Sequence, residues 1–222
     1  MAFSLSSIEN YRAELEAIGF EPPPAPRWNQ DWFPRLDAAA AYAMVRITQP
    51  RRIVEVGSGH STRFLARAVA DGGLATRITA IDPEPRATLA GLDVEWLRIP
   101  VERVKPFPRL EAGDILFIDS SHQLKPGNDV EFLLSTVIPR LPPGVRVHFH
   151  DIFLPDGYPT EWTWRRYDEQ SQVQRLIDEG ILQIDFSSHQ TVTREPEKLS
   201  GVLARLPLMP GALESSLWLT KH

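Results

Sequence analysis

The sequence contains no cysteine among its 222 residues. A chain without thiols forms no disulfide, no iron–sulfur cluster, no thiolate-bound zinc site and no thiol nucleophile. All of these are therefore excluded as sources of stability or chemistry. Because disulfides are also rare in reducing compartments, we expect a cytoplasmic location.

Long apolar runs are also missing. A membrane-spanning helix needs about 18 or more apolar residues without charges, and no segment of the sequence reaches that length. The first residues, MAFSLSSIENYRAELEAIGF, have no basic start and reach Glu9 before such a stretch can form. They do not have the pattern of a signal peptide, and we expect no membrane partner.

The chain has no excess of positive charge. Lys and Arg number 24 against 29 Asp and Glu, the net charge is −5, and no basic block occurs. Because a phosphate-binding face needs clustered Lys and Arg, nucleic acid is not expected as a partner. Hydrophobic residues at 42% and charged residues at 24% are instead typical of an ordinary globular protein.

The N-terminal part differs in composition from the rest. Residues 7–19 predict a short helix that a Ser caps and a Gly ends, and EPPPAP at residues 21–26 predicts an extended connector. We therefore interpret residues 1–35 as a helical and Pro-rich appendage. Residues 36–222 are the main domain, which begins with an Ala-rich helix over residues 36–48.

The main domain alternates between strand-like and helix-like segments. Apolar, β-branched runs predict strands at 51–56, 77–82, 94–99, 114–119 and 145–151, and helices are predicted at 61–70, 83–92 and 129–141. This alternation is typical of an α/β fold with a mostly parallel sheet covered on both faces. Farther along, a helix over 169–180 precedes strands over 181–189 and 215–221, which predict an antiparallel hairpin at the sheet edge.

The first predicted strand runs into a glycine-rich turn, VEVGSGHST, at the place where open α/β sheets bind ligands. Gly57 and Gly59 let a ligand approach the main chain. Ser61 and Thr62 are suited to cap the next helix, whose N-terminus attracts anions. A dinucleotide fingerprint has glycine at the position of Thr62, which disfavours NAD.

Two carboxylates accompany this turn. Glu55 ends an otherwise apolar strand, where a buried carboxylate needs a donor or a cation. Asp82 ends the second strand, 23 residues after Gly59, which is the separation of a carboxylate that accepts the hydroxyls of a ribose. The alternative for each acid is a solvated cap at a strand end.

The runs IVEVGSGHSTRFLA and ITAIDPEP resemble motifs I and II of the class I S-adenosylmethionine-dependent methyltransferases. The resemblance covers residues 36–222 and implies a Rossmann-like sheet of seven strands with an antiparallel closing strand. It implies S-adenosylmethionine (SAM) as the cofactor, with Gly57, Ser58 and Gly59 under its methionine portion and Asp82 on its ribose. The cofactor-binding residues that it implies are Glu55, Gly57, Ser58, Gly59, Ser61, Thr62, Asp82 and Asp119. Within the family, DSSH and HFHDIFLPDGYP most resemble a bacterial branch without assigned substrates, some of whose members lie near sugar and polysaccharide biosynthesis.

The fourth and fifth predicted strands end in DILFIDSSH and VRVHFHD. If these strands are neighbours, Asp119 and Asp151 converge, and two carboxylates about 4 Å apart repel by about 4 kcal/mol at an effective dielectric near 20. A Mg²⁺ or Mn²⁺ ion with two Asp ligands and one His ligand would neutralise them. Contact with the cofactor or with an Arg is the alternative.

The same residues resemble the metal site of the catechol and caffeoyl-CoA O-methyltransferases. The resemblance implies Asp119, His150 and Asp151 as metal ligands, with His150 and Asp151 in place of Asp and Asn. His122 stands where those families carry a lysine base, which implies His122 and Asp119 as catalytic residues, although a loop histidine is the alternative. His148 is interpreted as a packing residue.

The segment after the fifth strand, LPDGYPTEWTWRRYDEQ, combines aromatic and basic side chains: Tyr158, Trp162, Trp164, Tyr167, Arg165 and Arg166. Such side chains suit a sugar face, a planar ring or an anionic group. A packed excursion over the sheet end is equally compatible with the sequence.

We therefore predict a SAM-dependent methyltransferase that acts on a hydroxyl of a small molecule or saccharide, with a divalent metal as an optional participant and the oligomeric state left open. The His-x-His-Asp string motivates a metal-dependent hydrolase as the rival class, but a hydrolase has no use for the glycine turn and Asp82. A non-catalytic nucleotide-fold binding module is the third hypothesis, and a nicotinamide oxidoreductase is the fourth.

Overall fold

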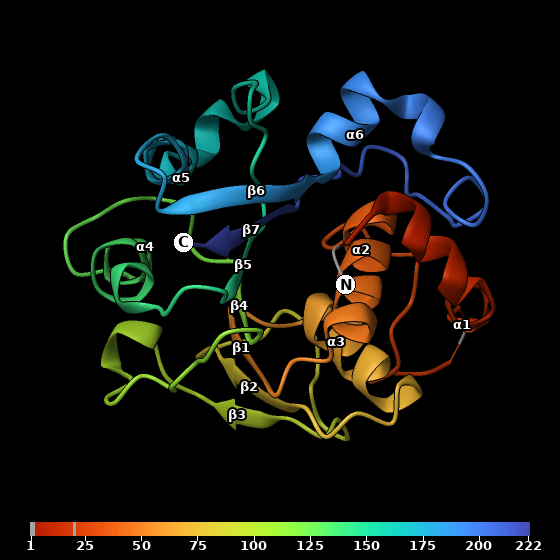
Figure 1. The fold of residues 1–222 in the computed structure, drawn as a ribbon, viewed down its shortest axis with the longest axis horizontal. Coiled ribbons are helices and arrows are strands. Elements are labelled where there is room, and N and C mark those ends of the chain that lie inside the picture. The colour runs from red at the N-terminus through yellow and green to blue at the C-terminus, as the bar shows by residue number, and fades with distance from the viewer. Residues whose placement is uncertain (1–2, 20) are drawn as a thin grey trace.

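A seven-stranded sheet runs through the middle of the molecule (Figure 1). The structure is a computed structural model that describes residues 3–19 and 21–222. The strands are β1 (Arg52–Val56), β2 (Arg77–Ile81), β3 (Glu95–Leu97), β4 (Ile115–Ile118), β5 (Arg146–Phe149), β6 (Leu182–Ser187) and β7 (Leu217–Lys221). Their order across the sheet is β3-β2-β1-β4-β5-β7-β6.

Strands β3, β2, β1, β4 and β5 pair in parallel, whereas β7 is antiparallel to both of its neighbours, β5 and β6. The central strands are short and nearly fully buried, as parallel strands covered on both faces must be. The predicted fold class is confirmed: an α/β, Rossmann-like sheet of seven strands, mostly parallel with an antiparallel closing strand.

Helices cover both faces of this sheet, with α2 and α3 on one side and α4 and α5 on the other (Figure 1). The α-helices are α1 (Arg12–Ala17), α2 (Arg35–Thr48), α3 (His60–Asp71), α4 (Asp129–Phe132), α5 (Glu169–Asp178) and α6 (Ser188–Arg194). Short 3-10 turns lie at Leu5–Tyr11, Val101–Arg103, Ile138–Arg140, Thr160–Arg165 and Pro196–Lys198, and a π-helical turn at Leu133–Val137 continues α4.

Two sequence-based predictions of secondary structure are wrong. Residues 83–92 form turns and no helix, because Pro83 and Pro85 lack the N–H groups that a helix interior needs. The strand predicted over residues 181–189 ends at Ser187, and α6 begins there. The Ser187 hydroxyl accepts a hydrogen bond from Gln190 N (3.1 Å) and caps the helix.

The N-terminal segment packs against the main sheet and its helices. Ile8, Leu15, Trp28 and Phe33 are buried in the same apolar cluster as α2 and α3. Trp28 also donates its indole N–H to the carbonyl of Leu15 at 3.1 Å. These residues therefore contribute to the hydrophobic core on that face of the sheet.

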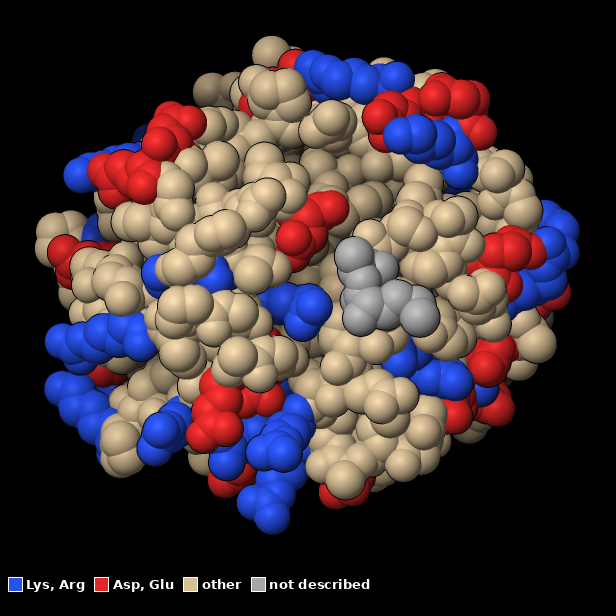
Figure 2. Space-filling view, viewed as in Figure 1, with Lys and Arg blue, Asp and Glu red and all other residues tan. Residues whose placement is uncertain are grey.

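No helix among the described residues is long and apolar enough to cross a membrane. Acidic and basic side chains are interspersed on the face shown in Figure 2, without one continuous basic area.

The order of the strands reverses between β1 and β4, because the chain leaves β1 toward β2 and later returns to the other side of β1. In open α/β sheets, ligands bind beyond the carboxyl ends of the strands at such a switch point. The glycine turn after β1 and the residues that follow β2, β4 and β5 all lie at this edge.

Candidate active site

The turn after β1 passes very close to the end of β4. Gly57 has a φ of 75°, and a Cβ at this position would overlap the carbonyl oxygen of Asp119. Backbone hydrogen bonds fix this approach, since Gly57 N donates to Ile81 O (3.1 Å) and Asp119 N donates to Val56 O (2.8 Å). Glycine is therefore required here both by the backbone angle and by the lack of space.

Asp82 is held in place at the end of β2 by three donors. Its Oδ2 accepts hydrogen bonds from Ser58 N (2.7 Å) and from the Ser58 hydroxyl (3.2 Å). Its Oδ1 accepts one from Glu84 N (2.7 Å). The carboxylate is thus oriented by the glycine turn itself, which links the first two strand ends into one unit.

A cleft of about 670 Å³ opens between the turns after β1, β2 and β4. Four of the predicted cofactor-binding residues line it: Gly57, Ser58, Asp82 and Asp119. The wall also includes Glu84, Arg86, Glu102 and Asn128. A larger hollow of about 770 Å³ lies at the amino ends of β4 and β5, but it shares no lining residue with the cleft.

The other four predicted cofactor-binding residues, Glu55, Gly59, Ser61 and Thr62, do not line the cleft. Thr62 is fully buried, and its hydroxyl accepts a hydrogen bond from Gly59 N (2.9 Å) at the start of α3. Ser61 donates its hydroxyl to Glu55 Oε1 (2.6 Å). The side chains of Glu55, Ser61 and Thr62 thus support the shape of the turn and do not line the cleft.

The carboxyl group of Glu55, behind the glycine turn, has a hydrogen-bond partner on only one of its two oxygens among the described residues. Its side chain is fully buried, Ser61 is its hydrogen-bond partner at Oε1, and Oε2 has no partner among the described residues. Burial raises the pKa of Glu55 to about 8, because the charged form loses its hydration. Most of this carboxyl is therefore protonated at neutral pH.

The ends of β4 and β5 bring two histidines onto two carboxylates. His122 Nε2 lies 3.2 Å from Asp119 Oδ1 and 3.6 Å from Asp151 Oδ2. His150 Nδ1 lies 3.7 Å from Asp119 Oδ1 and 3.5 Å from Asp151 Oδ1. The four side chains that the sequence singled out at these strand ends therefore form one cluster.

Each histidine is fixed from behind by a second carboxylate that the sequence reading missed. Glu169, the first residue of α5, accepts from Ser120 Oγ (2.9 Å) and lies 2.9 Å from His122 Nδ1. Asp37 in the first turn of α2 lies 3.3 Å from His150 Nε2. Both carboxylates are fully buried.

These contacts shift the pKa values in the cluster. Burial alone would lower the pKa of His122, but hydrogen bonds to Asp119 and Glu169 outweigh it and hold that pKa well above the usual value. Burial also opposes the charged form of His150, yet Asp151, Asp119 and Asp37 hold its pKa well above the usual value. Burial would raise the pKa of Asp119, and hydrogen bonds from both histidines hold it well below its usual value.

Two residues of the cluster adopt a left-handed backbone. His122 has a φ of 59° and Asp151 a φ of 55°. Non-glycine residues in this region cost free energy and persist where the surroundings fix them. Here the carbonyl of His122 accepts hydrogen bonds from the N–H groups of Asp168 (3.0 Å) and Glu169 (3.2 Å), which anchor the loop after β4 to the start of α5.

The predicted metal ligands do not form an ion site as their side chains stand. No three or more His, Asp or Glu side chains within residues 3–19 and 21–222 are arranged to hold a metal ion. The rings of His122 and His150 instead face the carboxylates of Asp119 and Asp151 directly.

His148 lies outside the cluster and packs in the core. It is fully buried, its ring stacks on Phe117 with centroids 3.7 Å apart, and its Nε2 lies 2.8 Å from Ser216 Oγ. Burial lowers its pKa well below the usual value, and the charge of His150 adds to this effect. Its position agrees with its interpretation as a packing residue.

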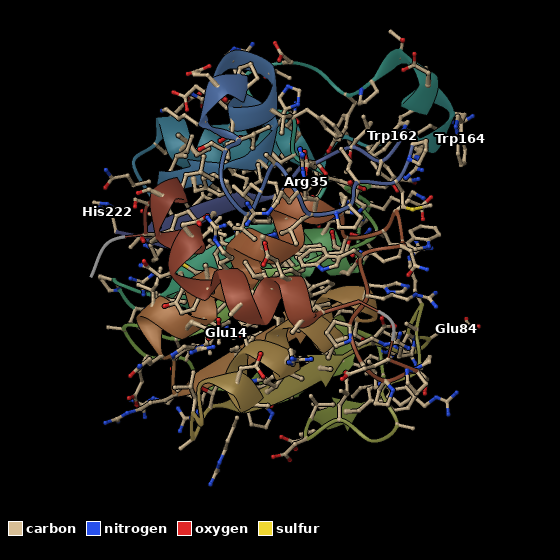
Figure 3. The ribbon with its side chains drawn as sticks, turned by 90° about the vertical axis from the view of Figure 1, so that its right-hand side faces the viewer. Glu14, Arg35, Glu84, Trp162, Trp164 and His222 are labelled. Atoms are coloured by element: carbon tan, nitrogen blue, oxygen red, sulfur yellow. The ribbon has the colours of Figure 1, made fainter. Side chains whose placement is uncertain are left out.

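A second cavity, of about 170 Å³, adjoins the cleft at Asp119 and Arg86, which line both. His122, His150 and Asp151 form its floor. Its outer wall includes Trp162, Arg165 and Tyr167 from the aromatic segment, together with Asp31, Trp32 and residues 211–213. Figure 3 shows Trp162 and Trp164 on the same side of the molecule as Glu84, which lines the cleft.

Comparisons with known proteins add to this geometry. A family model described as a methyltransferase domain matches residues 54–152, whereas a search of curated proteins found no match. An SAH-bound Podospora anserina methyltransferase, PaMTH1, has a TM-score of 0.56 and 16% identity over 100% of this chain and 98% of that one. A CmcI structure with Mg and SAM has a TM-score of 0.52 and 14% identity over 95% and 84% of the two chains. The O-methyltransferase TomG from Streptomyces achromogenes, involved in tomaymycin synthesis and complexed with SAM, has a TM-score of 0.51 and 16% identity over 98% and 88%.

At identities this low, the likeness to solved structures shows the fold alone. That fold, with β7 inserted antiparallel between β5 and β6, is the Rossmann-like sheet of the class I methyltransferases. The matched residues run from β1 through the end of β5 and contain the glycine turn, Asp82 and the histidine–carboxylate cluster. Residues 54–152 thus match a methyltransferase domain, in the stretch where motifs I and II of the sequence predicted one.

Proposed function

We propose that the protein transfers the methyl group of SAM to a hydroxyl group of a small molecule or saccharide. SAM occupies the cleft, with its ribose on Asp82 and its methionine portion over the turn at residues 57–59. The acceptor occupies the adjoining cavity, where the hydroxyl faces His122.

One observation carries this proposal: the cleft and the cavity meet at Asp119, and His122 lies at that junction. Methyl transfer is an in-line displacement that needs donor and acceptor atoms about 3 Å apart. Two adjoining hollows with a titratable ring at their junction provide such an arrangement. The hydroxyl oxygen bonds to the methyl carbon as the carbon–sulfur bond breaks, which leaves S-adenosylhomocysteine (SAH).

The hydroxyl proton is lost in this step, and His122 is the base that we propose for it. Glu169 fixes the His122 ring through Nδ1, so that Nε2 lies beside Asp119, which lines both the cleft and the cavity. Only the neutral imidazole accepts a proton. Because the carboxylates hold the pKa of His122 well above its usual value, we expect turnover to increase as the pH rises above neutrality.

A divalent cation on Asp119, His150 and Asp151 stays a prediction from the sequence. The oxygen and nitrogen donors are of a kind that Mg²⁺ and Mn²⁺ accept, and second carboxylates behind metal-bound histidines are common. Such an ion would supply positive charge that the protonated histidines otherwise provide. If turnover after exhaustive chelation is as fast as turnover with added Mg²⁺ or Mn²⁺, the prediction that a divalent cation takes part in the reaction is refuted.

The proposed function is tested by titration calorimetry followed by product analysis. We expect SAH to bind and NAD not to bind. We then expect isotope-labelled SAM to yield a methyl ether when hydroxyl compounds are supplied, detected by mass spectrometry. NAD binding without SAH binding would favour an oxidoreductase, and hydrolysis of an added substrate without SAM would favour the hydrolase. SAH binding with methyl transfer to nitrogen or carbon would refute the hydroxyl acceptor.

A further inference from the structure

Arg165 carries a positive charge in the outer wall of the cavity, and no carboxylate among the described residues pairs with it. Its guanidinium lies 4.0 Å from the centroid of the Trp162 ring and 5.4 Å from that of Trp164. Its Nη1 donates a hydrogen bond to the Tyr167 hydroxyl at 3.2 Å. Its Nε is buried and has no hydrogen-bond partner in the part of the chain that the structure describes.

The aromatic rings orient this guanidinium but do not neutralise it. A cation–π contact is an electrostatic attraction to the face of a ring, and the full charge stays on the arginine. Arg35 shows the contrast within the same protein, because it forms a two-pronged ion pair with Glu214 at 2.9 and 2.8 Å. Arg165 thus has free donor capacity for an anion, in a chain whose acidic residues outnumber its basic ones.

The position of Arg165 relative to His122 is constrained by a shared neighbour. The ring of Tyr167 lies 4.6 Å from the ring of His122 and 5.5 Å from the guanidinium of Arg165. The base and the guanidinium are therefore at most about 10 Å apart across the same cavity. Gln123 Nε2 donates to Arg165 O (2.7 Å) and ties the two loops together.

Most other charged groups around the cavity are engaged or are shared with the cleft, and the exception, Asp31 in the outer wall, is a carboxylate that cannot bind an anion. Asp119 and Asp151 face the two histidines. Arg86 stacks on Trp32 at 4.2 Å and lines both hollows, so its charge is available to the cofactor as well as to the acceptor. Arg165 lines the cavity and not the cleft, and, unlike the two histidines on the floor, it has no carboxylate against it among the described residues.

We propose that the methyl acceptor carries an anionic group, a carboxylate or a phosphate, and that Arg165 binds it. This inference rests on the proposed function and narrows its substrate class to small hydroxy acids or hydroxyl-bearing phosphates. The hydroxyl and the anionic group of the acceptor lie within about 10 Å of each other, because the base and Arg165 do. Guanidinium groups bind both kinds of anion through paired hydrogen bonds.

The test compares matched anionic and neutral hydroxyl compounds on the SAH-loaded protein by titration calorimetry. The pairs are dihydroxybenzoate with dihydroxybenzamide, glucuronate with glucose, and glucose phosphate with glucose. We expect the anionic member of at least one pair to bind roughly 10- to 100-fold more tightly than its neutral partner, as one charged hydrogen-bonded contact provides. In Arg165→Met this preference disappears, and in Arg165→Lys part of it remains.

Arg166→Met is the matched control. It removes one positive charge from the neighbouring residue, whose exposed side chain lines neither hollow. We expect this variant still to bind the anionic compound more tightly than its neutral partner. SAH affinity in all three variants should equal that of the wild type, which shows that the cofactor site is intact.

The anionic acceptor is refuted if no anionic compound binds more tightly than its neutral partner, whether both bind equally or neither binds. It is also refuted if Arg165→Met and Arg166→Met reduce the preference equally, since the effect is then general charge. Either result, with normal SAH binding, leaves the methyltransferase proposal standing. If the wild-type protein does not bind SAH at all, the proposed function itself is refuted.

Discussion

Asp82 is a single carboxylate prepared for a ligand by its neighbours. Donors from Ser58 and Glu84 hold both of its oxygens at the edge of the cleft. We predict that Asp82→Ala weakens SAH binding roughly 10- to 100-fold, because a charged hydrogen-bond partner of the ribose is lost. Calorimetry measures this, with Glu84→Ala as the control on the same cleft wall. Equal effects of the two substitutions would contradict a specific role for Asp82.

Glu55 gives a prediction about stability and pH. Its pKa is about 8 in the folded protein against 4.5 in the unfolded chain. Unfolding therefore releases a proton between these values, and the free energy of unfolding falls by up to about 1.4 kcal/mol per pH unit as the pH rises from 4.5 to 8. Glu55→Gln lacks this titration, so its stability relative to the wild type should increase over the same interval.

Denaturant titrations of both proteins from pH 5 to pH 9 check this prediction for Glu55. SAH affinity should fall less in Glu55→Gln than in Asp82→Ala, because Glu55 does not line the cleft. A pH-independent stability difference between wild type and variant would show that the carboxyl does not titrate in this range.

Asp151 separates chemistry from cofactor binding, because it lines the cavity and not the cleft. Its Oδ2 lies 3.6 Å from His122 Nε2, and its Oδ1 accepts from the Ser215 hydroxyl at 3.1 Å. We predict that Asp151→Asn lowers the rate constant of methyl transfer by at least about 100-fold, as expected for the loss of an acid–base contact. SAH affinity should stay within twofold of the wild type. Unchanged turnover would remove Asp151 from the site.

The residue scale also shows what the sequence could and could not predict. Asp119, His122, His150 and Asp151 follow two adjacent parallel strands, and adjacency alone brings them together. Their supports come from the starts of α2 and α5 and depend on tertiary packing. The available signal was Asp37, the one acid in an Ala-rich helix, since a charge that is buried among apolar side chains needs a partner. Glu169 gave no comparable signal.

Among the elements, the turn from β1 into α3 depends most on one residue. In Gly57→Ala, the alanine would have to adopt a left-handed φ, and its Cβ would overlap the carbonyl oxygen of Asp119. We predict a loss of about 2–5 kcal/mol in the free energy of unfolding, from about 1–2 kcal/mol of backbone strain and about 1–3 kcal/mol of overlap. Gly73→Ala is the control, because Gly73 has a φ of 56° and a Cβ there meets nothing within 4 Å. Equal losses would mean that the contact with β4 is unimportant.

The N-terminal elements provide a second prediction at this scale. Leu15 in α1 is fully buried in the cluster that includes α2 and α3. We expect Leu15→Ala to cost about 2–5 kcal/mol of stability, as for other large-to-small core changes. The neighbouring exposed Glu16 pairs with Arg205 at the surface, and Glu16→Ala should cost less than about 1 kcal/mol. Chemical denaturation distinguishes the two. The division into an appendage, residues 1–35, and a main domain, residues 36–222, stays a prediction from the sequence. A small effect of Leu15→Ala on stability would favour an appendage that folds independently of the main domain.

Strands were easier to predict than helices in this chain. Buried parallel strands leave short β-branched runs, and each of the five predicted in the first part of the sheet is present. The segment at 83–92 has helix-like apolar spacing, yet prolines and the hydrogen bond from Glu84 N to Asp82 commit it to turns. The helix predicted over 129–141 continues to Arg140 as π and 3-10 turns around Pro139, because proline removes a regular backbone hydrogen bond.

For the whole molecule, the proposed function assigns the two substrates of the reaction to separate hollows. The glycine turn and the β2 end form the cleft that we propose for SAM, whereas the β5 end and the aromatic segment form the cavity that we propose for the acceptor. Only Asp119 and Arg86 line both. The sequence predicted a donor side through motifs at strand ends, but the shape and charge of the proposed acceptor side depend on loops that only the folded structure brings together.

A crystal structure of the protein with SAH tests the central claim most directly. The account predicts that the ribose hydroxyls of SAH contact Asp82, that its amino-acid end lies over residues 57–59, and that its sulfur faces the junction at Asp119 and His122. An empty cleft at saturating SAH, or SAH bound in the hollow at the amino ends of β4 and β5, would contradict it.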